Sequence, residues 1–148
     1  MGTYTQIIYQ IVFSTKYRDP VMIKKNRDEL YGYISGIIRN KKCVVYKING
    51  VEDHLHILTD LHPSIALADL IKDIKIASSK YIKEKNLFPG FIGWQSGYGA
   101  FTYSANRKEI LINYIKNQEA HHLKKSYHDE SVELLREHAI DYEENYLF

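Results

Sequence analysis

The stretch CVVYKINGVEDHLHILTDL, residues 43–61, decides the fold. Its two runs of apolar and β-branched residues, 43–48 and 55–61, predict two strands. Asn49-Gly50 between them is typical of a tight β-hairpin turn, so we expect the strands to pair antiparallel. The second run begins with His54-Leu55-His56, and alternate residues of a strand project to the same face. Both imidazoles are therefore expected to point the same way, with Leu55 buried on the other side.

The segments around this hairpin predict further strands and helices from their apolar spacing. We expect strands over residues 4–13 and 100–103, and helices over residues 24–40, 64–85, 107–125 and 129–138. Ser64 is the expected cap of the second helix. The order β-α-β-β-α-β-α predicts an α+β fold of the ferredoxin-like split βαβ type. Its antiparallel sheet has helices on one face, and a C-terminal helix carries a tyrosine.

Length and composition restrict the class of protein. A chain of 148 residues, 45% hydrophobic and 13% aromatic, suits one domain over residues 1–148 with a substantial core. No stretch approaches the roughly 20 apolar residues of a membrane span, and no signal peptide is recognisable. A single Cys43 excludes an internal disulfide and a cysteine-based zinc cluster. The expectation is a cytoplasmic protein without a membrane segment.

Charge is distributed unevenly along the chain. Residues 1–126 hold 19 Lys and Arg against 11 Asp and Glu, whereas the predicted helical tail, residues 127–148, holds one Arg against seven acids. A basic body with an acidic tail suits a protein that binds a polyanion, although an ordinary solvated surface has a similar composition. The candidate phosphate contacts are basic residues of one loop and one helix: Lys16, Arg18, Lys72, Lys75, Lys80 and Lys83. Three aromatic residues could stack on unpaired bases or belong to the core: Trp94, Tyr98 and Phe101.

Two short motifs carry the candidate chemistry. Imidazoles suit transition metals, so His54 and His56 could share one cation, although they could also simply occupy a sheet face. Tyr114 and Gln118 are four residues apart and lie on one helix face, with His122 next in the row. A tyrosine hydroxyl, with a pKa of about 10, is a weak nucleophile that a divalent ion beside a phosphate would assist. Tyr114 could instead pack as an amphipathic side chain.

The two motifs together resemble those of a known family. His54-Leu55-His56 has the form His-hydrophobic-His, and Tyr114 and Gln118 have the form Tyr-x-x-x-Gln. With GYGAF at residues 97–101 and VFSTK at residues 12–16, the chain resembles the single-tyrosine HUH transposases. These are the small TnpA-like enzymes of insertion sequences that move as single-stranded DNA. The resemblance covers about residues 4–122.

The resemblance implies a mechanism and a set of site residues. Tyr114 would attack a DNA phosphate, which gives a 5′-phosphotyrosine link and a free 3′-hydroxyl without ATP. His54, His56 and Gln118 would hold one divalent ion, Mg²⁺ or Mn²⁺. The family further implies binding of single-stranded DNA hairpins at element ends, and a homodimer in which the tyrosine helix of one subunit acts in trans. His121 and His122 could add a ligand or contact the DNA backbone, although the metal site is described without them, and the acidic tail is assigned no catalytic role.

Two other functions fit the same motifs. One is a domesticated protein that binds and processes hairpins or repeats but is not mobile. The other is a metal-dependent phosphodiesterase that uses water in place of tyrosine. Intact His54, His56, Tyr114 and Gln118 argue against pure binding, and a covalent adduct between protein and DNA would exclude the phosphodiesterase.

Overall fold

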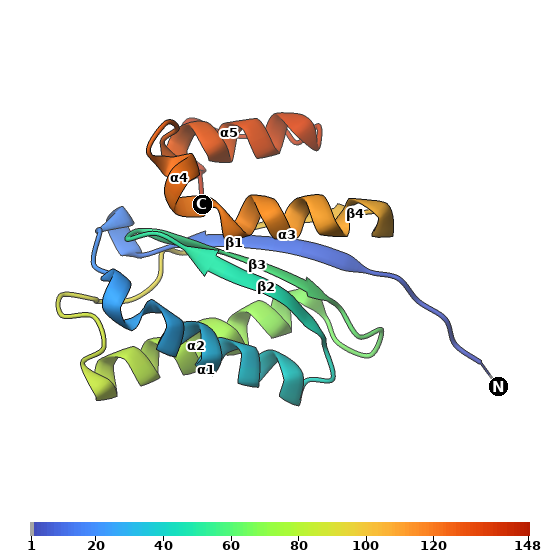
Figure 1. The fold of residues 1–148 in the computed structure, drawn as a ribbon, viewed down its shortest axis with the longest axis horizontal. Coiled ribbons are helices and arrows are strands. Elements are labelled where there is room, and N and C mark those ends of the chain that lie inside the picture. Colours follow the sequence, from blue (N-terminus) through green and yellow to red (C-terminus); the bar gives the residue numbers. More distant parts are fainter. Residues whose placement is uncertain (1) are drawn as a thin grey trace.

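A four-stranded antiparallel sheet with helices on both faces forms the protein in the computed structural model, which describes residues 2–148 (Figure 1). The strands are β1 (Ile8–Ser14), β2 (Val45–Gly50), β3 (His54–Asp60) and β4 (Gly99–Tyr103). The helices are α1 (Lys24–Asn40), α2 (Leu67–Lys85), α3 (Lys108–Lys116), α4 (Gln118–His122) and α5 (Tyr127–Glu137). Short 3₁₀ turns are η1 (Lys16–Arg18), η2 (Ala105–Arg107) and η3 (Glu144–Tyr146).

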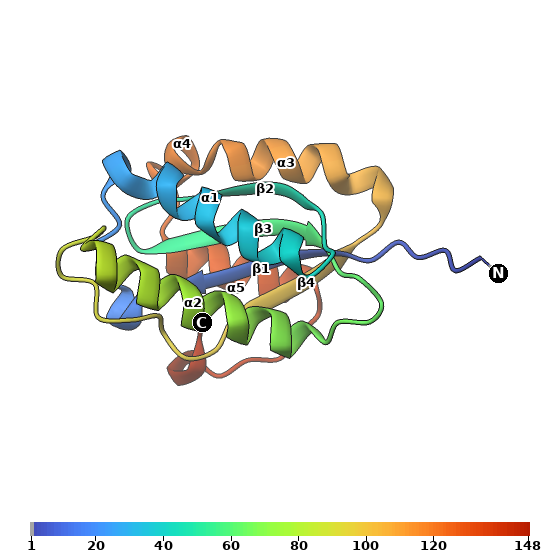
Figure 2. The same cartoon turned by 90° about the horizontal axis from the view of Figure 1, so that it is seen from below.

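The strand order β2-β3-β1-β4 is that of a split βαβ sheet, and all neighbouring strands run antiparallel. The predicted α+β class is therefore confirmed. Helices α1 and α2 cover one face, and α3, α4 and α5 lie over the other (Figures 1 and 2). Strand β3 lies between β2 and β1, so its side chains are enclosed by helices above and below.

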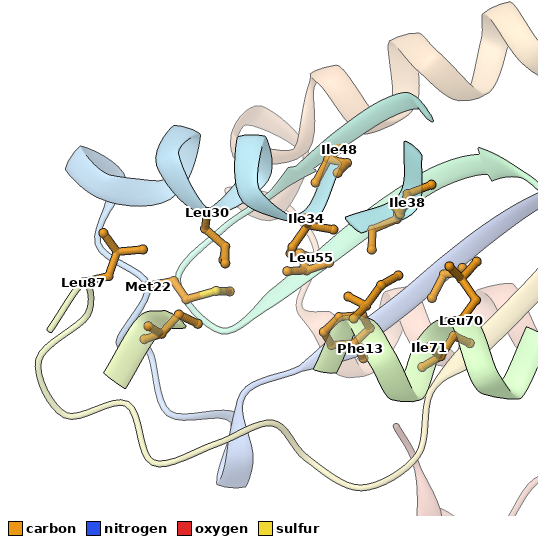
Figure 3. Packing of buried hydrophobic residues seen from close by; sticks show 14 of the residues in the cluster. Phe13, Met22, Leu30, Ile34, Ile38, Ile48, Leu55, Leu70, Ile71 and Leu87 are labelled. Carbon is orange, nitrogen blue, oxygen red and sulfur yellow. The ribbon is translucent and has the colours of Figure 1, made fainter. Parts of the chain in front are cut away.

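The main core lies between the sheet and helices α1 and α2 (Figure 3). Leu55 and Ile57 of β3 and Phe13 of β1 are fully buried there. From the helices, Ile34 of α1 and Ile74 of α2 complete the layer without exposed surface. Burial of such side chains contributes about 1.5–3 kcal/mol each, so this face supplies most of the apolar stabilisation and leaves the opposite face for polar groups.

The second face of the sheet is only partly apolar. At one end Leu58 of β3 packs against Leu111 and Ile115 of α3. Near β4, Phe101 is buried with the apolar side of α5. Its side chain is 2% exposed, so Phe101 belongs to the core and is not a surface for stacking bases. Between these two clusters lie His54 and His56.

The hairpin forms where the sequence predicts it, but the turn does not lie at Asn49-Gly50. Residues 51–53 make the turn, and Gly50 is the last residue of β2, paired with Leu55. A Cβ atom on Gly50 would lie 2.3 Å from the backbone oxygen of His54, so the close approach of β2 to β3 at this position requires glycine. Asn49 lies outside the turn, and its Nδ2 donates to the backbone oxygens of Ile115 and Lys116, both at 3.0 Å. This bond pair holds the end of α3 against the sheet.

The helix boundaries differ from the prediction in two places. Helix α2 begins after Ala66, because the hydroxyl of Ser64 shares a hydrogen bond with His62 Nδ1 at 2.6 Å and caps no helix. The single helix predicted over residues 107–125 is divided at Asn117, whose φ of −97° and ψ of 23° depart from helical values. No described helix of residues 2–148 is long and apolar enough to cross a membrane.

Replacement of Gly50 by alanine should destabilise the protein by about 1–3 kcal/mol, because the added methyl group must displace the backbone of His54. Urea unfolding monitored by circular dichroism measures the change. Gly36 in α1 is the matched control, since a Cβ atom added there would meet nothing within 4 Å. Gly36→Ala should stabilise by about 0.5–1 kcal/mol. Equal effects at both positions would contradict the close approach at Gly50.

Candidate metal and nucleophile site

Two buried histidines of β3 form the floor of the site. His54 and His56 project to the face opposite Leu55, as the strand pattern predicts, and neither has exposed surface. Each ring is oriented through Nδ1: His54 contacts Asp53 Oδ1 at 2.7 Å, and His56 contacts Gln10 Oε1 at 2.8 Å. Because both partners are oxygen acceptors, we assign the proton to Nδ1 in both rings. When a ring is neutral, its Nε2 offers a lone pair toward the helices above; when the ring is protonated, Nε2 donates a hydrogen bond to the carboxylate that lies there.

A carboxylate and a third imidazole face these lone pairs. Glu130 Oε1 lies 2.9 Å from His56 Nε2 and 3.3 Å from His54 Nε2. His122 Nε2 lies 3.0 Å from His54 Nε2 and 3.1 Å from Glu130 Oε1. The four donor atoms all lie within 4.8 Å of one another, a spacing that could hold a metal ion. Nitrogen and carboxylate donors in this combination suit a divalent transition metal.

Helix α5 brings Glu130 into the site. Ser126 caps the helix, its side chain accepting from the backbone N–H of Asp129 at 3.1 Å. Tyr127 then stacks on the ring of His54 with centroids 4.0 Å apart, and Leu134 packs in the cluster around Phe101. Glu130 shares the inward face with these residues because they are separated by three or four positions.

The tyrosine motif meets the histidine motif at the same carboxylate. The hydroxyl of Tyr114 donates a hydrogen bond to Glu130 Oε2 and lies 3.4 Å from His121 Nε2. Gln118 is fully buried, and its Nε2 donates to Glu130 Oε2 at 3.4 Å. Its Oε1 has no hydrogen-bond partner among the described residues. A buried amide oxygen left in this state is suited to contact a cation.

Electrostatics at the centre oppose ionisation of the tyrosine. Burial and the charge of Glu130 raise the pKa of Tyr114 well above its ordinary value. Burial opposes ionisation of Glu130 too, but hydrogen bonds from His122, His54 and His56 outweigh it and hold the pKa of that carboxyl low. Burial lowers the pKa of His56. Burial also disfavours the charged form of His54, but hydrogen bonds to Asp53 and Glu130 outweigh burial and raise the pKa of His54. A carboxylate is thus buried beside two imidazoles, His54 and His56, whose pKa values are shifted in opposite directions.

The structure therefore brings together the four residues singled out from the two motifs: His54, His56, Tyr114 and Gln118. The sequence analysis missed Glu130, and it left His122 open as an additional ligand or a contact to the DNA backbone. One signal for Glu130 was present, because it is an acid on the otherwise apolar or small face of the tail helix, between Tyr127 and Leu134. An acid in that position is buried only if it has partners.

The predicted basic contacts divide into two groups. An open groove beside α2 is lined by four lysines together with aromatic and polar residues: Lys16, Lys75, Lys80, Lys83, Tyr17, Trp94 and Gln95. Arg18 lies on the other side of η1, where its guanidinium sits 5.0 Å from the ring centroid of Tyr127. Lys72 is exposed on α2 and does not line the groove.

Tyr17 is the most unusual residue of this groove. Its φ of 60° is left-handed, and its side chain is 72% exposed. The backbone N–H of Tyr17 donates to Gln95 Oε1 at 3.0 Å, which helps to hold the turn. Strained backbone that presents an aromatic ring to solvent is common at functional sites.

Comparisons with known proteins show which family the chain is similar to. Residues 3–118 match the family described as transposase IS200 like. The chain is 28% identical over 124 residues to the ISDra2 transposase TnpA of Deinococcus radiodurans, covering 79% of this chain and 87% of that protein.

Two solved structures share the fold. One is a crystal structure assigned to a transposase of Deinococcus radiodurans R1, with a TM-score of 0.61 and 23% identity, covering 80% of this chain and 96% of the other. The second is a REP-associated tyrosine transposase bound to a REP hairpin, with a TM-score of 0.61 and 14% identity over 82% of this chain and 74% of the other. His122 and Glu130 lie beyond the residues that match the family.

Replacement of Asp53 by asparagine should lower the pKa of His54, because burial then acts with less opposition. The raised pKa in the folded wild type stabilises the fold fully below the unfolded value of about 6.5, and this contribution is lost as the pH rises through the folded pKa. The variant should therefore lose more stability at pH 5.5 than at pH 8. NMR titration of the His54 ring in EDTA, with urea unfolding at both pH values, measures these effects.

Glu52→Gln provides the control, because Glu52 lies in the same turn but binds Arg27 at 3.2 Å. Its His54 titration should match that of the wild type. An unchanged His54 pKa in Asp53→Asn would show that Asp53 does not set the charge of the ring.

Proposed function

The chain belongs to the IS200-like transposase family, and on that basis we propose that it cuts and rejoins single-stranded DNA at hairpin-marked element ends. The observation that carries the proposal is the meeting of Tyr114 with the buried histidine pair inside one chain. A hydroxyl nucleophile, a cluster of metal-type donors and a nearby basic groove supply what strand cleavage requires. The proposed mechanism is the one that the family resemblance implies, and the positions of these side chains support it.

The proposed step is a transesterification. The Tyr114 oxygen forms a bond to a backbone phosphorus, and the bond from that phosphorus to the 3′-oxygen breaks. The tyrosine proton is released and the departing oxygen gains one, which leaves a 3′-hydroxyl and a 5′-phosphotyrosine. The phosphodiester energy is retained in the new ester, so rejoining needs no nucleotide cofactor. Attack by the 3′-hydroxyl of another strand reverses the chemistry and frees Tyr114.

Activation of Tyr114 is the main difficulty, because its pKa is raised in this buried, negatively charged setting. Glu130 accepts the hydrogen bond of the hydroxyl and orients its oxygen. A divalent ion, Mg²⁺ or Mn²⁺, would supply positive charge that favours the phenolate and polarises the phosphate when bound. His54, His56 and Gln118 are the proposed ligands, supported by the two Nε2 atoms that project from the same face of β3 and by the buried amide oxygen, which has no hydrogen-bond partner among the described residues.

The basic groove supplies a path for the DNA strand. Lysines along it would contact phosphates without reading sequence, and the exposed ring of Tyr17 would stack on an unpaired base. Arg18, next to Tyr17, reaches toward the histidine site over Tyr127. We therefore propose that a strand passes from the groove around η1 to Tyr114. The hairpin bound by the REP-associated relative supports a hairpin as the DNA form that this chain recognises.

Replacement of Tyr114 by phenylalanine should abolish covalent attachment to DNA while leaving hairpin affinity within about twofold, because only the attacking oxygen is removed. The assay incubates the protein with labelled single-stranded oligonucleotides from the flanks of the gene and Mn²⁺. A denaturing gel detects the adduct, and a shift assay measures binding. An adduct formed by Tyr114→Phe would exclude Tyr114 as the nucleophile. Binding without any adduct from the wild type would favour the non-mobile hairpin-binding function.

Two controls divide the remaining alternatives. EDTA should stop cleavage by the wild type, and persistence of cleavage would contradict the metal requirement. Mixing Tyr114→Phe with His56→Ala tests the homodimer that the family resemblance implies. Restored cleavage would show that the tyrosine helix acts in trans. Because Tyr114 already meets His56 within one chain, with ring centroids 5.9 Å apart, the cis arrangement predicts that the mixture stays inactive.

Lys75 should make DNA affinity sensitive to pH. Burial lowers its pKa to about 8, so its charge is lost as the pH rises from 7 to 9 and phosphate binding weakens. Lys75→Arg stays charged over this range, and its affinity should fall less than that of the wild type in a fluorescence anisotropy titration. Lys72→Arg, outside the groove, should keep the wild-type pH dependence. Identical profiles for wild type and Lys75→Arg would remove Lys75 from the binding surface.

A further inference from the structure

We propose that Gln95 reads the edge of an unpaired base in the basic groove beside α2 and makes this groove prefer guanine to adenine. The inference rests on the proposed function, because it takes single-stranded DNA as the ligand. It adds a specificity-determining residue to a groove whose lysines contact phosphates without reading sequence. Gln95 lies between α2 and β4, and it lines the groove together with Tyr17.

Gln95 is held in place through its backbone. Its N–H donates to the backbone oxygen of Ser14 at 2.9 Å, and its carbonyl oxygen accepts from Lys75 Nζ, also at 2.9 Å. The preceding residue, Trp94, pairs with Thr15 in an isolated β-bridge. Because this segment is fixed to β1 on one side and to α2 on the other, Gln95 can contact a ligand with little loss of conformational entropy.

The orientation of the Gln95 amide follows from its contact with η1. Its Oε1 accepts a hydrogen bond from the backbone N–H of Tyr17 at 3.0 Å. A backbone N–H can only donate, so the amide oxygen and not the amide nitrogen must face Tyr17. The two N–H bonds of Nε2 have no acceptor within residues 2–148 and are available to a ligand. Gln95 therefore offers hydrogen-bond donors to the groove.

The other polar side chains of the groove have the same bias. Four lysines line it, and an ammonium group donates hydrogen bonds but cannot accept them. The hydroxyls of Ser79 and Ser96 can do either, so they favour neither kind of base. The groove is therefore rich in donors and poor in acceptors, which favours a base edge that consists of acceptors.

Guanine has such an edge. Its O6 and N7 are neighbouring acceptors, whereas adenine presents N7 beside a 6-amino donor. A glutamine commonly pairs with adenine by using both its amide oxygen and its amide nitrogen. Here the oxygen of Gln95 faces the backbone of Tyr17, which hinders that pairing and leaves the donor contacts to guanine.

Tyr17 places a base within reach of this amide. Its ring is 72% exposed and offers a flat surface on which a base can stack. Lys16 Nζ lies 5.6 Å from the centroid of the ring, a position from which it can contact the phosphate of the stacked nucleotide. The hydrogen bond between Tyr17 and the side chain of Gln95 keeps the amide beside this residue. Stacking, charge and edge recognition thus meet at one nucleotide.

Binding of synthetic single strands to the full-length protein in EDTA tests the inference without cleavage. Each strand is a short chain of abasic sugars with one base at its centre, so the phosphates are the same and only the base differs. Fluorescence anisotropy should give an affinity for guanine about fivefold higher than for adenine, the effect expected of one or two hydrogen bonds. Hypoxanthine, which keeps O6 and N7, should bind as guanine does, and 7-deazaguanine, which lacks N7, should bind more weakly.

Substitution of Gln95 changes the groups that the base meets. In Gln95→Glu a carboxylate oxygen replaces the Nε2 donors, so the preference should reverse in favour of adenine. Gln95→Ala should bind the two bases with equal affinity. Gln6→Glu is the matched control, because it makes the same chemical change at an exposed residue outside the groove, and it should keep the wild-type preference for guanine.

Equal affinity of the wild type for guanine and adenine would overturn the inference and leave the proposed strand cleavage intact. A preference for guanine that persists in Gln95→Ala would also overturn it. Absence of any binding would remove the groove as the path of the DNA, and with it both this inference and that part of the proposed function. Circular dichroism shows whether each variant folds, and the base analogues test the same contact in the unaltered protein.

Discussion

The two-residue repeat of β3 is the constraint on which the rest of the structure depends. Leu55 and Ile57 enter the core under α1 and α2, while His54 and His56 project to the other face. A shift of one residue in the register would exchange these sets and bury imidazoles in an apolar layer. Burial of Leu55 and Ile57 on one face of β3 therefore fixes the positions of His54 and His56 on the other face. Gly50 maintains this register by allowing β2 to approach β3 closely.

The buried carboxylate of Glu130 is the second organising element. An ionised carboxylate without partners would cost several kcal/mol to bury, yet this one contacts four imidazoles and the hydroxyl of Tyr114. Helix α5 is consequently held by polar contacts at one turn and by apolar packing at the others. The acidic tail has a role that charge counts did not suggest, because one of its seven acids is part of the site.

The basic groove and the site lie on opposite sides of η1, and this turn connects them. Thr15 is tied on one side to Asp53, through its backbone N–H at 2.9 Å, and pairs on the other with Trp94. Lys16 then faces the groove, whereas Arg18 faces Tyr127. The left-handed backbone of Tyr17 makes this reversal of direction possible. Binding and chemistry are thus adjacent in space although they lie on different faces of the sheet.

Local patterns in the sequence determined the fold class and the common face of His54 and His56, because strand and helix periodicities are short-range. They also placed Tyr114 close to Gln118, although these residues belong to two helices, α3 and α4. The predicted position of the hairpin turn and the predicted continuous helix across Asn117 were wrong. Asn49 does not form the turn, because its side chain donates hydrogen bonds to the end of α3. Only the tertiary structure decided that Glu130 joins the histidines. Its position depends on how α5 docks, and contacts between residues 74 positions apart leave no periodic trace in a sequence. Which side chains share a site is set by packing, not by spacing along the chain.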